Sequence, residues 1–134
     1  KVMNKLIKAI DFYIDPPLEK ELEFFEKRFL CLKITFNRTP DGKAPKLNIK
    51  GVKLIDSDGK EYSEKKDFSR KHGIGAQMSE FASFSFVPKN DELFLRDGSE
   101  FEIILSDLDG DRKFKKYTYV LANESWSEKG EILE

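Results

Sequence analysis

The sequence has few of the residues from which metal and redox sites are built. It has one cysteine, Cys31, and one histidine, His72, in 134 residues. One cysteine excludes an intramolecular disulfide and a zinc site built from several cysteines. The sequence has no Gly-x-Ser-x-Gly elbow, P-loop or Rossmann glycine pattern, so it lacks the motifs of a hydrolase nucleophile and of a nucleotide site. We therefore predict no catalytic residues, no metal-binding residues and no cofactor.

Net charge and long apolar runs are also nearly absent. The 24 Lys and Arg residues and the 25 Asp and Glu residues leave a formal net charge of -1 with histidine neutral. A dedicated nucleic-acid-binding domain is normally clearly basic, so nucleic acid is disfavoured as a partner. The longest unbroken apolar runs have only a few residues, against the ~20 that span a bilayer. We predict no transmembrane segment in this chain.

Alternation of apolar and polar residues is the main signal that is present, and it is typical of half-buried β-strands. The predicted strands cover 6–14, 29–36, 47–54, 82–86, 101–105 and 114–121, with a β-bulge at Gly51. The length fits one domain, which we place at 1–122 with a C-terminal tail at 123–134. Short strands separated by turns predict a mainly β fold, an antiparallel β-sandwich of about seven strands.

One segment departs from the alternating pattern. Asp15-Pro16-Pro17 resembles a helix start, with proline at the first helical position. Apolar residues then recur at helical spacing. They are Leu18, Leu22, Phe25 and Phe29. This spacing predicts a short helix over 17–27, and a charged loop leading into the next strand is the alternative.

The stretch LIDSDGKEY, residues 54 to 62, contains acidic residues and a glycine, as a calcium loop does. An EF-hand loop has oxygen ligands at positions 1, 3 and 5, glycine at position 6 and glutamate at position 12. Counted from Asp56, position 5 is Lys60, and the glycine falls at position 4. The spacing therefore does not match, and we interpret the stretch as a turn.

Asp-Gly pairs recur along the chain, and such pairs tolerate the positive φ of tight turns. They occupy 41–42, 58–59, 97–98 and 109–110. The last pair lies among Asp107, Asp109 and Asp111, whose spacing also fails the EF-hand pattern beyond position 5. Three of the pairs, at 58–59, 97–98 and 109–110, lie between predicted strands, and there we predict turns. We leave open whether the acidic turns bind calcium weakly.

Two basic clusters contain aromatic residues, an arrangement that can bind phosphate backbones and stack bases. The first has Lys65, Lys66, Arg70 and Lys71 around Phe68, and the second has Arg112, Lys113, Lys115 and Lys116 around Phe114. A solvated strand face is the simpler interpretation, because lysines on exposed strands also discourage edge-to-edge aggregation. The clusters give an alternative function, the binding of a polyanion or nucleic acid.

His72 lies in the polar, glycine-containing stretch KKDFSRKHGIG, which predicts a long surface loop. A general base that acts with Ser69 or Cys31 is the functional alternative. Cys31 lies in the middle of a predicted strand, where a small buried side chain is the usual role. A hydrolase with an unrecognised site therefore remains a third reading.

Two long stretches of the chain are similar to those of a known family. FLCLKITFNRT (29–39) followed by LNIKGVKLIDSDGKEY (47–62) resembles the central part of bacterial immunoglobulin-like, telokin-like domains of unknown function, and FASFSFVPKND (81–91) looks like the family's strand closed by proline. The likeness covers about half the chain. It implies an immunoglobulin-like sandwich of the kind often found on extracytoplasmic lipoproteins, and it implies no catalytic residues.

These observations favour a non-catalytic binding or accessory module of the bacterial cell envelope, with another protein or a cell-surface ligand as partner. The candidate surface residues are aromatic: Tyr13, Phe68, Tyr117, Tyr119 and Trp126. The sequence begins with Lys1, which fits a removed signal or lipid-anchor segment as well as a trimmed chain. We expect an extracytoplasmic, membrane-anchored protein, with a cytoplasmic location as the alternative.

Overall fold

The fold consists of two antiparallel β-sheets. The computed structural model describes residues 6–65, 76–78, 80–107, 113–129 and 131–132, and these residues form nine strands and no helix. The strands are β1 (Ile7–Asp15), β2 (Phe29–Phe36), β3 (Lys46–Ile55), β4 (Ala76–Met78), β5 (Phe81–Phe86), β6 (Glu100–Asp107), β7 (Lys115–Ala122), β8 (Ser125–Glu128) and β9 (Glu131–Ile132).

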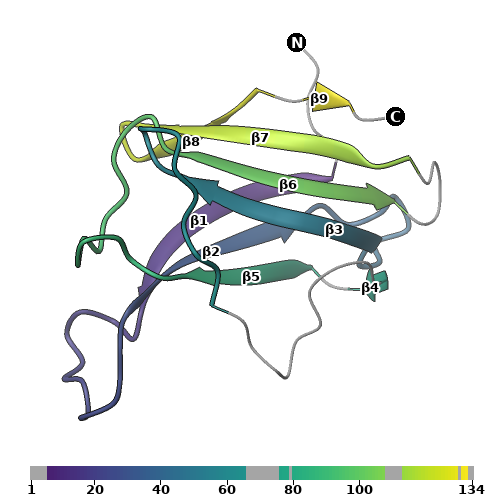
Figure 1. Cartoon of the computed structure of the whole chain (residues 1–134). Helices are drawn as coiled ribbons and strands as arrows, with labels where there is room; N and C mark the ends of the chain where they lie inside the picture. The colour runs from purple at the N-terminus through teal and green to yellow at the C-terminus, as the bar shows by residue number, and fades with distance from the viewer. Residues whose placement is uncertain (1–5, 66–75, 79, 108–112, 130, 133–134) are drawn as a thin grey trace.

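The order of the strands confirms the predicted antiparallel sandwich. One sheet has the order β1-β2-β5, and the other has β4-β3-β6-β7-β8 with β9 paired to β7 (Figure 1). Strands β4 and β9 have only three and two residues, so seven of the described strands build most of the two sheets. The order β1-β2-β5 in one sheet and β3-β6-β7 in the other corresponds to strands A-B-E and C-F-G of immunoglobulin-like sandwiches.

The core lies between the sheets and is built from alternate residues of each strand. Strand β2 supplies Leu30, Leu32 and Ile34, all fully buried, and β6 supplies Phe101 and Ile103 from the opposite sheet. Full burial of one such side chain contributes ~1.5–3 kcal/mol. The strict period of two in these strands is therefore a direct consequence of having one face in the core.

The β-bulge predicted at Gly51 is present in β3. The register with β6 shifts between Ile49 and Gly51. Leu47 and Ile49 are buried before the shift and Leu54 is buried after it, so the inward phase moves from odd to even positions. One extra residue therefore lets both halves of β3 face the same core.

The Asp-Gly turns predicted at 58–59 and 97–98 are confirmed, and the pair at 41–42 also lies in a turn. Gly42, Gly59 and Gly98 have φ values of 79°, 86° and 92°, a backbone conformation that glycine adopts without steric cost. The fourth pair, at 109–110, lies outside the described residues.

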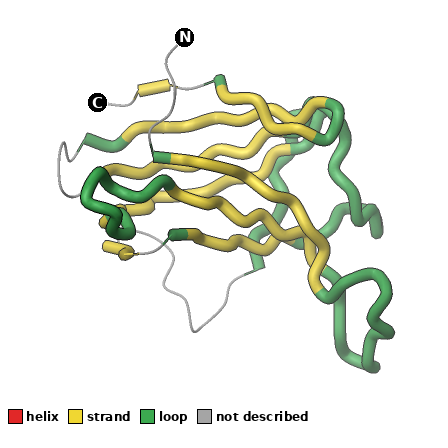
Figure 2. Tube along the Cα trace, turned by 180° about the vertical axis from the view of Figure 1, so that it is seen from behind, coloured by secondary structure: helices red, strands yellow, loops and turns green. Residues whose placement is uncertain are grey.

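The predicted helix over 17–27 is wrong. This segment is a loop with separate turns, closed by bonds from the Lys20 N–H to the Pro17 carbonyl and from the Glu26 N–H to the Glu23 carbonyl, both 3.0 Å. Figures 1 and 2 show the loop between β1 and β2 extending beyond the end of the sandwich. No sheet lies there to cover an apolar helix face, so the helical spacing of Leu18 and Leu22 has no surface to pack against.

The segment after Ala122 lies along the second sheet. Strand β8 pairs with β7, and the Trp126 ring packs edge-on against Phe101, with ring centroids 6.5 Å apart. Nowhere in the described ranges is there a helix of the length and apolar character needed to cross a bilayer.

Candidate binding surfaces

The described aromatic residues that were predicted to form a binding surface do not form a shared exposed patch. Tyr13 is exposed on β1, whereas Tyr117 and Trp126 are partly buried against the core. Tyr119 is buried, because it alternates toward the opposite sheet in phase with Leu121, and it is a core residue rather than a surface residue. Phe68 lies outside the described residues.

The basic clusters are described only in part, since Lys66, Arg70, Lys71 and Arg112 lie outside the described residues. The Lys65 backbone bonds to Ser85 of β5, and its ammonium lies 4.5 Å from the centre of the Phe29 ring. Lys115 and Lys116 belong to β7 in the other sheet, next to exposed Lys113, and the Lys116 ammonium lies 3.6 Å from Glu102. Lys65 thus lies beside the β1-β2-β5 sheet, whereas Lys115 and Lys116 belong to the other sheet.

Of the residues considered for nucleophilic chemistry, the structure describes Cys31. Cys31 is buried on β2 with its Sγ 3.5 Å from Ser85 Oγ. Burial raises the pKa of the Cys31 thiol above its ordinary value, which disfavours the reactive thiolate. Ser69 and His72 lie outside the described residues.

The β1–β2 loop, residues 16–28, carries the most exposed aromatic side chains of the described chain. Phe24 is 92% exposed and Phe25 is 89% exposed, and their rings meet edge-on with centroids 4.6 Å apart. Leu18 and Leu22 in the same loop are also exposed. Sequence reasoning missed this surface by assigning Phe25 to the buried face of a helix. The adjacent Phe24, which does not fit that face, was the available signal.

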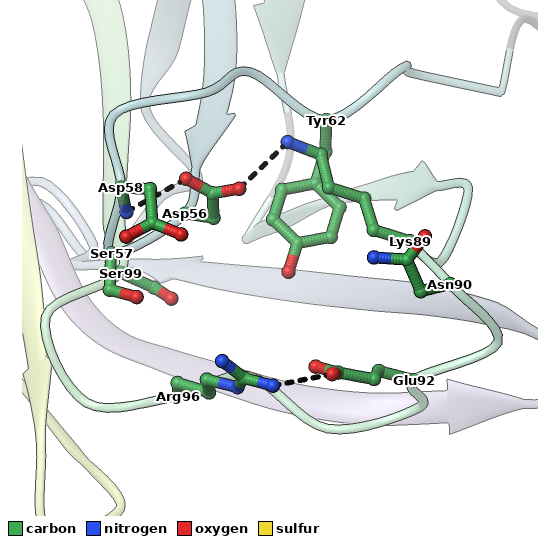
Figure 3. A pocket seen from close by; sticks show the side chains of 9 residues that line it. All are labelled: Asp56, Ser57, Asp58, Tyr62, Lys89, Asn90, Glu92, Arg96 and Ser99. Carbon is green, nitrogen blue, oxygen red and sulfur yellow. Dashed lines mark hydrogen bonds and ion pairs between the residues drawn. The ribbon is translucent and has the colours of Figure 1, made fainter.

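A small polar pocket lies at the same end of the sandwich, between the Asp56–Lys60 turn and residues 89–99 (Figure 3). Its volume is about 90 Å³, enough for one polar head group. The turn is organised by Asp56, whose Oδ1 accepts the N–H groups of Asp58 at 2.9 Å and of Lys60 at 2.8 Å. The interpretation of LIDSDGKEY as a turn is confirmed by these bonds.

The other wall of the polar pocket comes from the loop between β5 and β6. The Lys89 ammonium lies 3.0 Å from Asp56 Oδ2 and donates to the Lys60 carbonyl, also at 3.0 Å. It also lies 4.5 Å from the centre of the Tyr62 ring. These contacts join two segments far apart in the sequence and leave neither Asp56 oxygen open to an incoming ligand.

Two titratable groups of the pocket, Asp56 and Tyr62, have shifted pKa values. Hydrogen bonds from the Lys60 N–H and then from Lys89 lower the pKa of the Asp56 carboxyl below its ordinary value. Burial, and next the charge of Asp56, raise the pKa of the Tyr62 hydroxyl. At neutral pH the pocket therefore contains an ionised Asp56 and a neutral Tyr62.

Ser99 is the least expected member of the pocket. It is 1% exposed, and its Oγ has no hydrogen-bond partner among the described residues. Figure 3 shows it beside Ser57 at the pocket wall. A buried hydroxyl left without a partner costs ~1–3 kcal/mol. The pocket lining thus includes a hydrogen-bonding group that the described contacts do not use.

Within the described ranges, no group of three or more His, Cys, Asp or Glu residues is placed to hold a metal ion. Asp109 and Asp111 lie outside the described residues, and the side chain of Asp107 is not described. The question of weak calcium binding at these three aspartates therefore stays as the sequence left it.

The fold and the two candidate surfaces define this chain as an antiparallel β-sandwich with a projecting aromatic loop and a small polar pocket at one end. No protein-family model, curated protein or solved structure matches the chain.

Proposed function

We propose that the protein is a non-catalytic binding module that docks a partner protein through the β1–β2 loop. The observation that carries the proposal is the almost complete exposure of Phe24 and Phe25. Aromatic side chains bury 150–250 Å² each and dominate the energetics of protein interfaces. Two adjacent phenylalanines held in water at the tip of a projecting loop are typical anchor residues for a partner's apolar pocket.

The loop has a defined conformation that favours binding. Arg28 Nη2 lies 3.2 Å from the Leu18 carbonyl oxygen and also donates to the carbonyls of Pro17 and Lys20. Glu26 accepts the Glu23 N–H at 2.9 Å and forms an ion pair with Lys20 at 3.5 Å. These bonds tie both ends of the loop to each other. A preorganised loop loses less conformational entropy on binding.

The charges around the two phenylalanines indicate which partner fits. Four glutamates and three cations occur in the loop: Glu19, Glu21, Glu23 and Glu26 against Lys20, Lys27 and Arg28. Lys20 pairs with Glu26, and Arg28 is directed at carbonyls at the two ends of the loop, so the loop has a net charge of -1 and its unpaired glutamates, Glu19, Glu21 and Glu23, precede the two phenylalanines. Such an acidic rim disfavours anionic membrane surfaces and favours an apolar socket bordered by Lys or Arg.

Site-specific photo-crosslinking tests this proposal. A photoreactive phenylalanine analogue at position 24, expressed in cells of the source organism, should capture one protein, which is then purified and titrated against the chain. We expect Phe25→Ala to weaken its Kd by at least about 30-fold, the loss typical of an interface anchor. Added salt and Glu23→Lys should also weaken binding, because the partner's rim is basic.

The matched control is Phe94→Ala, which removes another exposed phenylalanine from the same end of the sandwich. It should leave Kd within about twofold, as expected for a residue outside the contact. Equal losses for Phe94→Ala and Phe25→Ala would contradict a specific anchor. Binding of the wild-type chain to anionic vesicles, lost in Phe25→Ala, would identify a membrane surface instead and overturn the proposed protein partner.

The location at the bacterial cell envelope is a further part of the proposal. It is supported by the resemblance to telokin-like domains and by no contact in the structure. Fractionation of cells that express the complete gene, with detection of a lipid-modified precursor, tests it. Recovery of the protein in the cytosolic fraction would contradict it.

A further inference from the structure

The polar pocket has a hydrogen-bonding group with no role in the fold. Ser99 Oγ is buried and has no partner among the described residues, although its backbone N–H bonds to the Arg96 carbonyl at 3.1 Å. The bonds that hold this turn are all made by main-chain atoms or by Asp97, whose Oδ1 accepts the Asn123 N–H at 3.1 Å. The Ser99 hydroxyl therefore keeps a hydrogen-bonding capacity that the described contacts do not use.

The charges of the pocket leave one carboxylate unneutralised. Asp56 pairs with Lys89 at 3.0 Å, and Glu92 pairs with Arg96 at 2.5 Å. Three carboxylates and two cations line the pocket, so its net charge is -1. The carboxylate without a cation is that of Asp58, which is exposed. An anion entering the pocket meets this charge while both cations are already paired with carboxylates of the same pocket. The pocket therefore favours a cationic group.

The geometry of the oxygens narrows the class of cation. Figure 3 shows the Asp58 carboxylate and the hydroxyls of Ser57 and Ser99 on one wall. The Tyr62 hydroxyl points into the space between that wall and the Arg96–Glu92 pair (Figure 3). The described residues give no cluster suited to a metal ion. A primary ammonium group has three N–H donors and no acceptor, which matches a wall of carboxylate and hydroxyl oxygens.

We propose that the polar pocket binds a primary ammonium group, held by the Asp58 carboxylate and by the Ser57 and Ser99 hydroxyl oxygens. The ammonium belongs to a lysine side chain or to a small free amine, since a pocket of about 90 Å³ admits the head group and little more. This site is separate from the β1–β2 loop, so a test of ammonium binding does not depend on the proposed docking function.

The test is a titration of the ¹⁵N-labelled chain with methylammonium chloride, followed by amide chemical shifts. Methanol and sodium chloride at the same concentrations control for size and for ionic strength. We expect saturating shifts at the amides of Asp58, Gly59 and Ser99 with methylammonium only. Titrations with ethanolamine and with N-acetyl-lysine methylamide distinguish the two sources of the group, because the natural one binds more tightly.

Two variants assign the contacts. Asp58→Asn keeps a turn-forming Asn-Gly pair and removes the charge, so it should weaken methylammonium binding by about tenfold without unfolding the turn. Ser99→Ala removes one acceptor and should weaken binding by about fivefold. Asp91→Asn, an exposed change in the same loop and outside the pocket, should have no effect.

Three results would overturn the proposal. The first is a shift that grows linearly with methylammonium and never saturates. The second is an equal response to methanol, which would mean that the pocket holds neutral molecules such as water. The third is saturable binding of sodium sulfate in place of methylammonium, which would identify an anion site.

Discussion

Lys89 Nζ lies 3.0 Å from Asp56 Oδ2 and joins the turn after β3 to the loop after β5 across 33 residues of sequence. Both side chains are half-buried, with exposures of 28% for Lys89 and 18% for Asp56. The pair fixes one wall of the polar pocket against the other. Its removal should therefore affect both stability and the shape of that site.

Lys89→Met should lower the free energy of unfolding, because the Asp56 carboxylate loses its cation in a partly desolvated position. Urea denaturation at pH 7 measures the change. Lys43→Met is the matched control, since the Lys43 ammonium lies 4.0 Å from Asp41 and both side chains are exposed. Surface pairs of this kind contribute little, so Lys43→Met should leave the urea midpoint unchanged. Equal midpoints for all three proteins would show that the Lys89 contact adds nothing.

The stability of the fold should depend on pH through Asp56. Hydrogen bonds hold the pKa of this carboxyl below its unfolded value of about 3.9. A lowered folded pKa gives stability that is present above the unfolded pKa and is lost as pH falls through the folded pKa. Asp56→Asn should therefore be less stable than wild type at pH 7, and the difference should shrink progressively below about pH 4. A difference that stays constant from pH 7 to pH 2 would refute this assignment.

Three glycine substitutions separate backbone strain from steric contact. Gly59→Ala and Gly98→Ala both force alanine into positive φ, which costs ~1–2 kcal/mol. A Cβ at Gly98 would also lie 3.3 Å from Ser57 Cβ, whereas one at Gly59 meets nothing within 4 Å. Gly98→Ala should therefore be the more destabilised in thermal unfolding. Gly51→Ala, with no positive φ and open space, should be neutral or more stable by up to ~1 kcal/mol.

Phe101 connects the core to the C-terminal strand β8. It is fully buried, with ring centroids 6.3 Å from Phe84 and 6.5 Å from Trp126. Phe101→Ala should lower the free energy of unfolding by ~3–5 kcal/mol, the range for a large core aromatic. Because Trp126 is the only tryptophan, its fluorescence should shift to the red in the folded variant. Phe94→Ala, which removes an exposed ring, should change stability by no more than ~0.5 kcal/mol.

The strands were predictable because each has one face in the core, and this physical condition imposes a period of two on the local sequence. The bulge at Gly51 was predictable for the same reason, since Leu47 and Leu54 both had to face inward across a change of phase. The loop conformation of residues 16–28 was not predictable in this way. Helical spacing describes a possible apolar face, but only the tertiary structure determines whether another surface lies opposite it.

The polar pocket could not be predicted from local patterns. Its walls come from segments that antiparallel pairing and sheet packing bring together, and the sequence around Ser99 gives no sign that this residue lines the same pocket as Asp58. The Asp56 turn itself was predictable, because its hydrogen bonds join residues at most four apart. What sequence reasoning missed was that the loop after β5 closes over it.

The last pair of the β1–β2 ladder is Asp15 with Phe29, and none of the core residues comes from the loop between them. The tip that carries Phe24 and Phe25 is therefore an exchangeable cassette. Another sequence of matching span, grafted between the two strands, should redirect recognition while the sandwich folds as before.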